Sequence, residues 1–283
     1  MKVVLATCEE LPDGNDDDAL LLGPLADVGV TAEWAVWGAQ PPADLVVLRA
    51  TWDYPSRLPA FLAWCDSVPN LANPTVAVRW NTDKSYLVDL ARAGVPVVPT
   101  TVVDPGFTDW PDGEFVVKPT VGAGSRGALR VAAGDFAAAA EHLAALGVPA
   151  LVQPYQSGVD TRGETAVVFL GGRYSHAFTK DALLTPDAEV DGSGLFVVER
   201  LSATTPEPAQ RRVAEDALDA AGVLLGLPRA AFLYARVDLV PGADGRPLLL
   251  ELELVEPSLG LRHADTGAPL RFASAVRAAL AAR

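Results

Sequence analysis

Short hydrophobic runs and amphipathic segments alternate over the first part of the chain. Residues 2–7 and 44–49 are β-branched and leucine runs between turn residues, which predicts two buried strands. Between them, DDDALLLGPLADVG has helical spacing, with its acidic residues at the end where the helix dipole is positive. A second helix is predicted at roughly 57–67. Strand, helix and strand in this order predict a parallel α/β unit.

The pattern changes beyond residue 80, where the strands become separated by glycine-rich turns. NTDKSYLVDLARAG predicts a helix that is capped by Asn81 or Thr82 and stopped by Gly94. The strands EFVVKP and ALRVA are predicted on either side of VGAGSRG. A helix over 135–146 and the strand ALVQPY follow.

The last part of the chain predicts two hairpins and two helices. Residues 163–180 form the first hairpin, around GGR, and a long helix is expected to start at Thr205-Pro206, a cap followed by proline. ARVDLV, a turn at ADG and LLLELELVEP form the second hairpin, before a terminal helix. We therefore predict three parts: an α/β domain over 1–80, an α+β subdomain with a glycine-rich flap over 81–152, and a second α+β subdomain over 153–283.

Composition limits the classes of partner. Half of the 283 residues are hydrophobic and one fifth are charged, which is typical of a soluble globular protein. The net charge of −14 argues against a nucleic-acid partner, because binding to phosphate backbones needs a basic surface. Neither a membrane-spanning run nor a signal peptide is recognisable, so we expect a cytoplasmic protein without a membrane partner. Cys8 and Cys65 indicate neither a disulfide framework nor a zinc site.

Lysine is rare in this chain, and its positions are therefore informative. Of the 22 basic residues only four are lysines: Lys2, Lys84, Lys118 and Lys180. Where arginine fills most basic positions, a remaining lysine can mark a site that needs a compact ammonium group. An ordinary surface position explains Lys2 equally well. The neighbouring residues must decide for the other three.

The glycine-rich segment favours a phosphate-binding flap over a dinucleotide fingerprint. Gly122, Gly124 and Gly127 fit G-x-G-x-x-G, but a Rossmann site needs a helix directly after this pattern. Here a strand is predicted instead. Strand, glycine loop and strand resemble a flap whose backbone N–H groups bind phosphate oxygens, and Lys118 lies just upstream. A mobile surface hairpin is the alternative.

A second cluster of chemistry is predicted on the C-terminal hairpin. Arg236 and Asp238 share one face of their strand, and Glu251 and Glu253 share one face of the next. Three carboxylates so close together repel one another unless a cation lies between them, and Mg²⁺ prefers such hard oxygen ligands. Arg236 could stabilise a developing oxyanion. A solvent-facing acidic sheet is the alternative.

Together these motifs resemble the ATP-grasp superfamily from about residue 80 to the C-terminus. The resemblance rests on WNTDK, VVKP, the glycine loop, QPY and the D…E-x-E pattern, in the order that the family uses. It implies an α/β fold of the ATP-grasp type, in which two α+β subdomains grip ATP. The nucleotide-binding residues that it implies are Lys84 and Lys118 on the phosphates, the loop residues Gly122, Gly124, Ser125 and Gly127, Gln153, Pro154 and Tyr155 on adenine, and Asp160 on the ribose.

The resemblance also implies a metal site and a catalytic cation. Asp238, Glu251 and Glu253 would hold Mg²⁺, although the family commonly has Glu-x-Asn at the last two positions. This departure leaves Glu256 as a competing ligand. Lys180 occupies the position of a cation near the transferred phosphate. His176 is expected on the same face as Lys180, with packing or hydrogen bonding as an equally good explanation.

The substrate pocket is predicted from position alone. Ligands of open α/β sheets lie beyond the carboxyl ends of the strands, where the strand 44–49 ends. Local packing at a domain interface is the alternative for Trp52, and a structural salt bridge is the alternative for Arg49. The predicted substrate residues are Arg49, Thr51, Trp52 and Asp53, with Ser258 and Arg262 after the metal strand.

The segments TCEELP, LRATWDY and ELELVEPSL resemble a small ATP-grasp subfamily with a member that forms D-cycloserine from O-ureido-D-serine. The resemblance implies an ATP- and Mg²⁺-dependent carboxylate–amine ligase that acts through an acyl phosphate on small molecules, releasing ADP and phosphate. An ATP-grasp kinase, an intermolecular ligase acting on amino acids and a non-catalytic nucleotide-binding module are the alternatives. A homodimer is expected as the commonest assembly.

Overall fold

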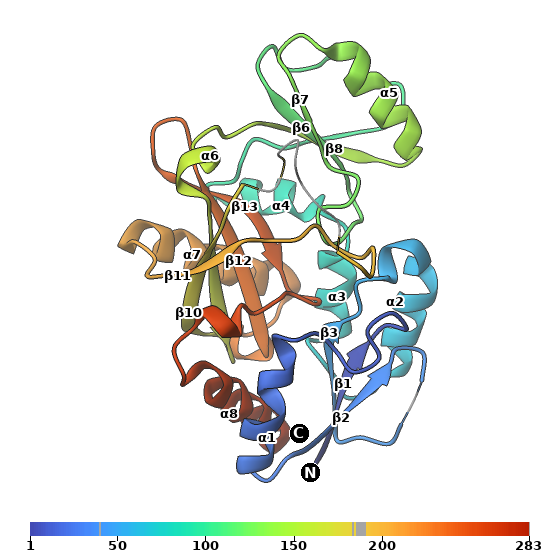
Figure 1. Ribbon diagram of the computed structural model, residues 1–283, viewed down its shortest axis with the longest axis vertical. Helices are drawn as coiled ribbons and strands as arrows, with labels where there is room; N and C mark the ends of the chain where they lie inside the picture. The colour runs from blue at the N-terminus through green and yellow to red at the C-terminus, as the bar shows by residue number, and fades with distance from the viewer. Residues whose placement is uncertain (40, 183, 185–190, 283) are drawn as a thin grey trace.

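Three β-sheets and the helices packed on them form the computed structural model, which describes residues 1–39, 41–182, 184 and 191–282 (Figure 1). The N-terminal sheet lies at one end of the molecule and the small sheet β5-β8-β6-β7 at the other (Figure 1). The largest sheet lies between them. Both chain termini lie at the end formed by the N-terminal sheet (Figure 1).

The N-terminal sheet has the order β2-β1-β3-β4, and its paired strands are parallel. The two predicted strands are confirmed as β1 and β3. The edge strand β2 was not predicted, because TAEWAV is only half-buried and lacks a continuous apolar run. The elements of this part are β1 (Lys2–Thr7), η1 (Asp18–Leu21), α1 (Leu22–Asp27), β2 (Thr31–Val36), β3 (Leu45–Ala50), η2 (Tyr54–Arg57), α2 (Leu58–Ser67) and β4 (Leu71–Ala72).

Two helices replace the single helix predicted after residue 80. They are α3 (Thr75–Asn81) and α4 (Tyr86–Arg92). The predicted cap at Asn81 or Thr82 is wrong, because Asn81 ends α3 and Thr82 is its C-cap. The Asn81 side chain instead donates to the Leu252 carbonyl and accepts from the Leu254 N–H, both at 2.7 Å.

The small sheet is antiparallel, with the order β5-β8-β6-β7. It encloses a hydrophobic cluster of its own, in which Trp110 stacks on Phe115 beneath α5. The predicted strands around the glycine loop are confirmed as β6 and β7. The elements here are β5 (Thr101–Val103), β6 (Phe115–Pro119), β7 (Leu129–Val131), α5 (Phe136–Leu146) and β8 (Ala150–Pro154).

The largest sheet has the order β11-β10-β9-β12-β13 and contains both predicted hairpins. Its long helix begins at Pro208 rather than at Thr205-Pro206, because Glu207 and Gln210 close a reciprocal capping box there. The elements are α6 (Val159–Arg162), β9 (Glu164–Leu170), β10 (Arg173–Lys180), β11 (Leu201–Thr204), α7 (Pro208–Leu225), η3 (Arg229–Ala231), β12 (Tyr234–Pro241), β13 (Pro247–Glu253), η4 (Leu261–His263) and α8 (Ala268–Ala281).

One hydrophobic cluster joins the N-terminal sheet to the largest sheet. Val3, Leu5 and Leu45 pack in it with Phe178 and with Phe272 of α8. Buried polar contacts strengthen this junction, since the Asn73 amide donates to the carbonyls of Tyr234 and Leu254 at 2.9 and 2.8 Å. The three-part division at residues 80 and 152 stays a proposal. Among the described residues, no helix has the length and apolar character that crossing a bilayer requires.

Candidate active site

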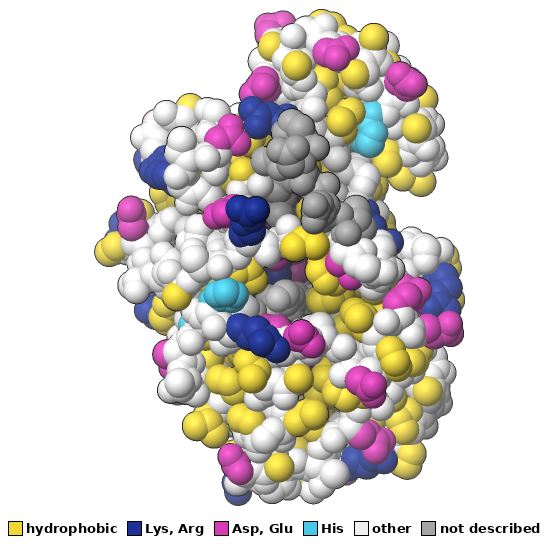
Figure 2. All heavy atoms as spheres, viewed as in Figure 1, with side chains coloured by type: hydrophobic (Ala, Val, Ile, Leu, Met, Phe, Trp, Pro, Cys, Tyr) yellow, Lys and Arg dark blue, Asp and Glu magenta, His cyan; other side chains and the backbone are white. Residues whose placement is uncertain are grey.

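A cavity of about 730 Å³ opens where the three sheets meet. Acidic and basic side chains gather near the middle of the face shown in Figure 2. The cavity draws residues from the glycine loop, from the two C-terminal hairpins and from the segments that follow β1 and β3. Of the predicted site residues, those that line it are Lys84, Lys118, Gly122, Gly124, Ser125, Gln153, Pro154, Tyr155, Lys180, Arg236, Glu251, Glu253, Trp52, Ser258 and Arg262.

Two lysines stand at the glycine-loop end of the cavity. Lys84 Nζ donates to the Gly122 carbonyl at 2.6 Å and lies 3.1 Å from Glu251 Oε1. Burial opposes its charge, but Glu251 raises the pKa of Lys84. Lys118 has no hydrogen bond or ion pair within the described residues, and burial lowers its pKa although Glu251 favours the charged form. The described residues therefore leave its ammonium group available to a phosphate, which would offset the cost of its burial.

The glycine loop is packed against residues 191–198. The Gly124 carbonyl accepts from the Val197 N–H at 3.1 Å. A Cβ on Gly124, whose φ is +63°, would clash with the Leu195 carbonyl oxygen and lie 2.7 Å from the Phe196 Cα. Phe196 in turn meets the Trp52 ring edge-on, with centroids 5.2 Å apart. Gly127 does not line the cavity: a Cβ there would lie 3.3 Å from Leu146 and Pro119 side-chain atoms, within the small subdomain.

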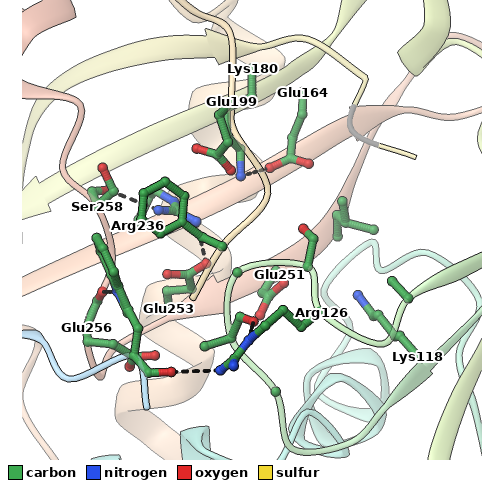
Figure 3. A pocket seen from close by; sticks show the side chains of 18 of the residues that line it. Lys118, Arg126, Glu164, Lys180, Glu199, Arg236, Glu251, Glu253, Glu256 and Ser258 are labelled. Carbon is green, nitrogen blue, oxygen red and sulfur yellow. Dashed lines mark hydrogen bonds and ion pairs between the residues drawn. The ribbon is translucent and has the colours of Figure 1, made fainter. Parts of the chain in front are cut away.

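The C-terminal hairpin places its charged residues in facing pairs. The register sets Arg236 opposite Glu253 and Asp238 opposite Glu251. Arg236 donates to both oxygens of Asp238. It also donates to the Ser258 carbonyl at 3.0 Å and to Glu253 (Figure 3). Burial raises the pKa of Glu253 to about 7 even though Arg236 lowers it. The predicted hairpin is confirmed, and its carboxylates face side-chain cations.

Lys180 connects the two hairpins. Its ammonium group lies 2.9 Å from Asp238 Oδ2 and pairs with Glu164, the residue opposite it on β9. Burial opposes the charge of Lys180, but Asp238 and Glu164 raise its pKa. Figure 3 shows Lys180 between Glu164 and Glu199. A continuous network of opposite charges thus runs from Glu164 to Glu253.

The predicted magnesium ligands do not form a preassembled metal site. Among the described residues, no group of three His, Cys, Asp or Glu side chains is arranged to hold a metal ion. Glu251 and Glu253 line the cavity, whereas Asp238 does not and has both oxygens bound by Arg236. Two partly buried carboxylates that face a cavity fit Mg²⁺ as a donor set. Asp238 is instead held by Arg236 and Lys180.

The predicted adenine segment lines the cavity, next to the strand that carries Lys118, but Asp160 does not line it. Gln153 is buried and donates to Thr100 Oγ1 at 2.9 Å. Asp160 is exposed, where it accepts from the Tyr155 hydroxyl and pairs with Arg130 at 3.3 Å. Arg130 also stacks on the Tyr155 ring. We therefore replace the predicted ribose contact of Asp160 with a role in fixing the Tyr155 ring.

Three of the predicted substrate residues lie outside the cavity lining. Arg49 is fully buried, 2.8 Å from Asp18 Oδ1, and donates to the Pro257 carbonyl at 2.8 Å. Thr51 is also fully buried. Asp53 is bound by the Trp37 indole at 2.6 Å and by Arg57. Side chains at the end of a strand can bind a ligand only if they are not already buried in internal contacts. We therefore assign Arg49 to the structural salt bridge with Asp18 and not to substrate binding.

The remaining predicted substrate residues do reach the cavity. The Trp52 indole donates to the Glu256 carbonyl at 3.0 Å. Ser258 supplies its carbonyl to Arg236, as described above. Arg262 stands at the exposed rim, and its backbone N–H and that of Leu261 donate to Asp17 at 2.9 and 3.0 Å. These contacts join the N-terminal domain to the segment that follows the predicted metal strand.

Several cavity residues were not predicted as site residues. Arg126, in the glycine loop, donates to the Trp52 carbonyl at 2.9 Å. Glu164 could have been found by counting back from the GGR turn, but the irregular register between Tyr174 and His176 shifts that count. His176 points elsewhere: its Nε2 lies 2.7 Å from the Leu259 carbonyl, which makes hydrogen bonding its role. The other unpredicted cavity carboxylates include Glu199 and Glu256, the latter weighed only as a metal ligand.

Comparison with known proteins identifies the family. A family profile described as the N-terminal domain of D-cycloserine synthetase DcsG matches residues 3–76. The cycloserine biosynthesis protein DcsG of Streptomyces lavendulae is 42% identical over 277 residues, covering 90% of this chain and 91% of that protein. The chain belongs to the DcsG family and has the fold of ATP-grasp ligases.

Solved structures agree with this assignment. The crystal structure of D-cycloserine synthetase DcsG matches with a TM-score of 0.87 and 38% identity, covering 99% of this chain and 100% of that one. The ATP-grasp ligase PsnB with its minimal precursor matches with a TM-score of 0.63, 19% identity and coverages of 98% and 99%. D-alanine–D-alanine ligase from Bacillus anthracis, complexed with ATP, matches with a TM-score of 0.65, 13% identity and coverages of 100% and 98%.

The predicted fold and enzyme class are confirmed. The last two matches show the fold alone, and the DcsG family profile lies on residues 3–76, in the N-terminal part of the chain. This DcsG-family member is an ATP-dependent ligase. The assignment favours ligation over the alternative of an ATP-grasp kinase.

Proposed function

We propose that the protein closes the ring of O-ureido-D-serine to give D-cycloserine, at the expense of ATP. The observation that carries the proposal is the 42% identity to the cycloserine biosynthesis protein DcsG across nine tenths of the chain. The cavity supports it, because its lining combines Arg236 with Lys84, the glycine loop and Lys118, which has no ion pair among the described residues. The two lysines and the glycine loop are suited to binding a triphosphate, and Arg236 is suited to binding the reacting carboxylate.

In the proposed reaction the substrate carboxylate attacks the γ-phosphorus of ATP, and the bond from phosphorus to the ADP oxygen breaks. The nitrogen bonded to the side-chain oxygen then attacks the acyl phosphate carbon, forming the ring C–N bond while phosphate leaves. The carbamoyl group is absent from the product, so water must release it as ammonia and carbon dioxide. Arg236 would stabilise the tetrahedral oxyanion, because its guanidinium is fixed by Asp238, Glu253 and Ser258.

Magnesium belongs to the proposal through Glu251 and Glu253. Bound there, Mg²⁺ would neutralise phosphate charge during transfer. We propose Asp238 as the residue that orients Arg236 and Lys180, since both cations bind it directly. Lys84 and Lys118 would bind the phosphates, and the segment Gln153 to Tyr155 would hold adenine. The packed glycine loop would exclude water from the acyl phosphate.

The test is product analysis with purified protein, ATP, Mg²⁺ and O-ureido-D-serine. We expect D-cycloserine by mass spectrometry, with one ADP formed per ring closed, and a hydroxamate when hydroxylamine is added to trap the acyl phosphate. A stable phosphorylated substrate without hydroxamate would establish a kinase instead. Amide products from mixed amino acids, with O-ureido-D-serine left intact, would establish an intermolecular ligase. Cytoplasmic location and a homodimer stay predictions.

A further inference from the structure

The acidic side chains of the cavity differ in whether they already have a cationic partner. Glu251 pairs with Lys84, Glu253 with Arg236, and Glu164 with Lys180. Glu256 lines the same cavity, yet within the described part of the chain its carboxylate has no hydrogen bond or ion pair. The exposed fraction of the residue is only 8%, and the part of it that remains exposed faces the cavity. A buried charge without a partner is costly, and such groups are retained where a ligand completes them.

The backbone of Glu256 is held in place by Trp52, which is in turn bound by the glycine loop. Its carbonyl accepts from the Trp52 indole at 3.0 Å, and the Trp52 carbonyl accepts from Arg126 of the glycine loop at 2.9 Å. Figure 3 shows Glu256 on the same side of the pocket as Arg126. Trp52 of the N-terminal domain thus fixes the backbone of Glu256 directly, and the glycine loop does so through Trp52. A preorganised group of this kind serves recognition.

Glu256 also lies close to the reacting end of the cavity. Arg236 binds the side chain of Glu253 and the carbonyl of Ser258, and Glu256 lies between these two residues along the chain. A ligand carboxylate that approaches Arg236 therefore comes near Glu256. In an α-amino acid the ammonium group is attached to the carbon next to the carboxylate. One such ligand can place its carboxylate toward Arg236 and its ammonium group toward Glu256.

We propose that Glu256 binds the α-ammonium group of the substrate and so makes this ligase specific for amino acids. The inference rests on the proposed function, because it takes O-ureido-D-serine as the substrate. Burial, with a contribution from Glu253, raises the pKa of the Glu256 carboxyl to about 8. This is the direction expected for a buried carboxyl that has no cation beside it. The ammonium group would supply that cation. Glu256 thereby acquires a role separate from the magnesium ligands Glu251 and Glu253.

The experiment compares two substrates in three proteins. The substrates are O-ureido-D-serine and its des-amino analogue, 3-(ureidooxy)propionic acid, which keeps the reacting carboxylate and nitrogen. In wild type the ratio of kcat/KM should favour the amino substrate. Glu256→Gln should lower kcat/KM for O-ureido-D-serine by about 10- to 100-fold, mainly through KM, the size of one hydrogen bond to a charged group. Its activity on the des-amino analogue should stay within about twofold, which also reports that the variant is folded.

The matched control is Glu199→Gln, the same chemical change in the same cavity. It should leave the substrate ratio at its wild-type value. A ratio that collapses in Glu199→Gln and not in Glu256→Gln would overturn the assignment. Equal losses on both substrates in Glu256→Gln, accompanied by a higher Mg²⁺ requirement, would make Glu256 a metal ligand and also overturn it.

A second variant keeps the test decisive should Glu256→Gln fail to fold. Glu256→Asp retains the charge at a shorter reach, and it should keep part of the discrimination between the two substrates. An Asp variant with the full wild-type ratio and unchanged KM would contradict a direct contact. Wild-type protein that leaves O-ureido-D-serine unconverted would refute the proposed function itself. Conversion by wild type with an unchanged ratio in both Glu256 variants would refute only the role of Glu256.

Discussion

Arg236 forms hydrogen bonds to Asp238, two residues further along the same strand, through two separate nitrogens. Nε donates to Oδ1 at 2.9 Å and Nη2 donates to Oδ2 at 2.8 Å. This pairing holds the guanidinium plane fixed beneath the cavity, with Nη1 on the Ser258 carbonyl. Only a planar guanidinium can satisfy these acceptors together.

Arg236→Lys should therefore lower kcat by about 10²- to 10³-fold, the usual loss when a donor to a developing oxyanion is removed. ADP release coupled to product formation measures it. Arg246→Lys, at the exposed turn of the same hairpin, is the matched control and should change kcat by less than about twofold. An Arg236→Lys protein with wild-type kcat would remove Arg236 from the reaction.

Lys118→Met should separate stability from activity. Lys118 is a partly buried ammonium group with no ion pair in the described residues, so replacing it with an apolar side chain of similar length removes a desolvation cost. We expect an equal or higher Tm together with turnover reduced by about 10²-fold or more. Calorimetry and steady-state kinetics give the two values. Lys2→Met, at an exposed strand end, should change neither; a lower Tm and retained turnover in Lys118→Met would oppose the phosphate role.

Arg49→Met should damage the fold and not substrate binding. The change leaves Asp18 buried without its partner, which costs about 3–5 kcal/mol in comparable pairs. Urea denaturation measures the loss, and Arg49→Met combined with Asp18→Leu should recover a large part of it. KM for the amino substrate should be unchanged in the folded fraction. A raised KM with full stability would return Arg49 to the substrate site.

Gly124→Ala should uncouple ATP use from ring closure. The added Cβ would clash with the Leu195 carbonyl oxygen, in a backbone conformation that already disfavours side chains, and would force the glycine loop away from residues 191–198. Water would then reach the acyl phosphate, so we expect more ADP than D-cycloserine, with kcat for product lowered by about tenfold. Gly113→Ala, which meets nothing within 4 Å, should keep the one-to-one ratio. Equal ratios in both variants would contradict the sealing role.

Local patterns predicted the elements and the charged strands, but not how the side chains pair. Alternation along ARVDLV and LLLELELVEP was sufficient to place Arg236 and Glu251 on one face of a hairpin. The same alternation could not show that Asp238 would be consumed by Arg236 and Lys180, since Lys180 comes from another hairpin. The prediction that Arg49 binds substrate failed for a similar reason, because its ion-pair partner Asp18 is 31 residues away in the sequence. Pairing at such separations depends on how the sheets pack.

Helix boundaries show the same dependence on tertiary contacts. Asn81 is a good cap by residue type, yet its amide is used by the backbone of β13, which is distant in sequence. The start of α7 could have been located from Glu207 and Gln210, because a capping box is a local signal. Glu256 lies three residues after the E-x-E motif. Its burial and its lack of an ion pair among the described residues, which the sequence does not show, distinguish its role from that of the metal ligands.

One hydrophobic cluster joins Val3 and Leu45 to Phe272, and Asn73 binds the carbonyls of Tyr234 and Leu254. The two larger sheets therefore share a core, whereas the sheet β5-β8-β6-β7 has a core of its own. We expect ATP to enter by a movement of this small sheet about its connections. The small sheet would carry Lys118 and the glycine loop with it. Binding of the nucleotide and closure of the glycine loop against Trp52 would therefore occur in the same movement.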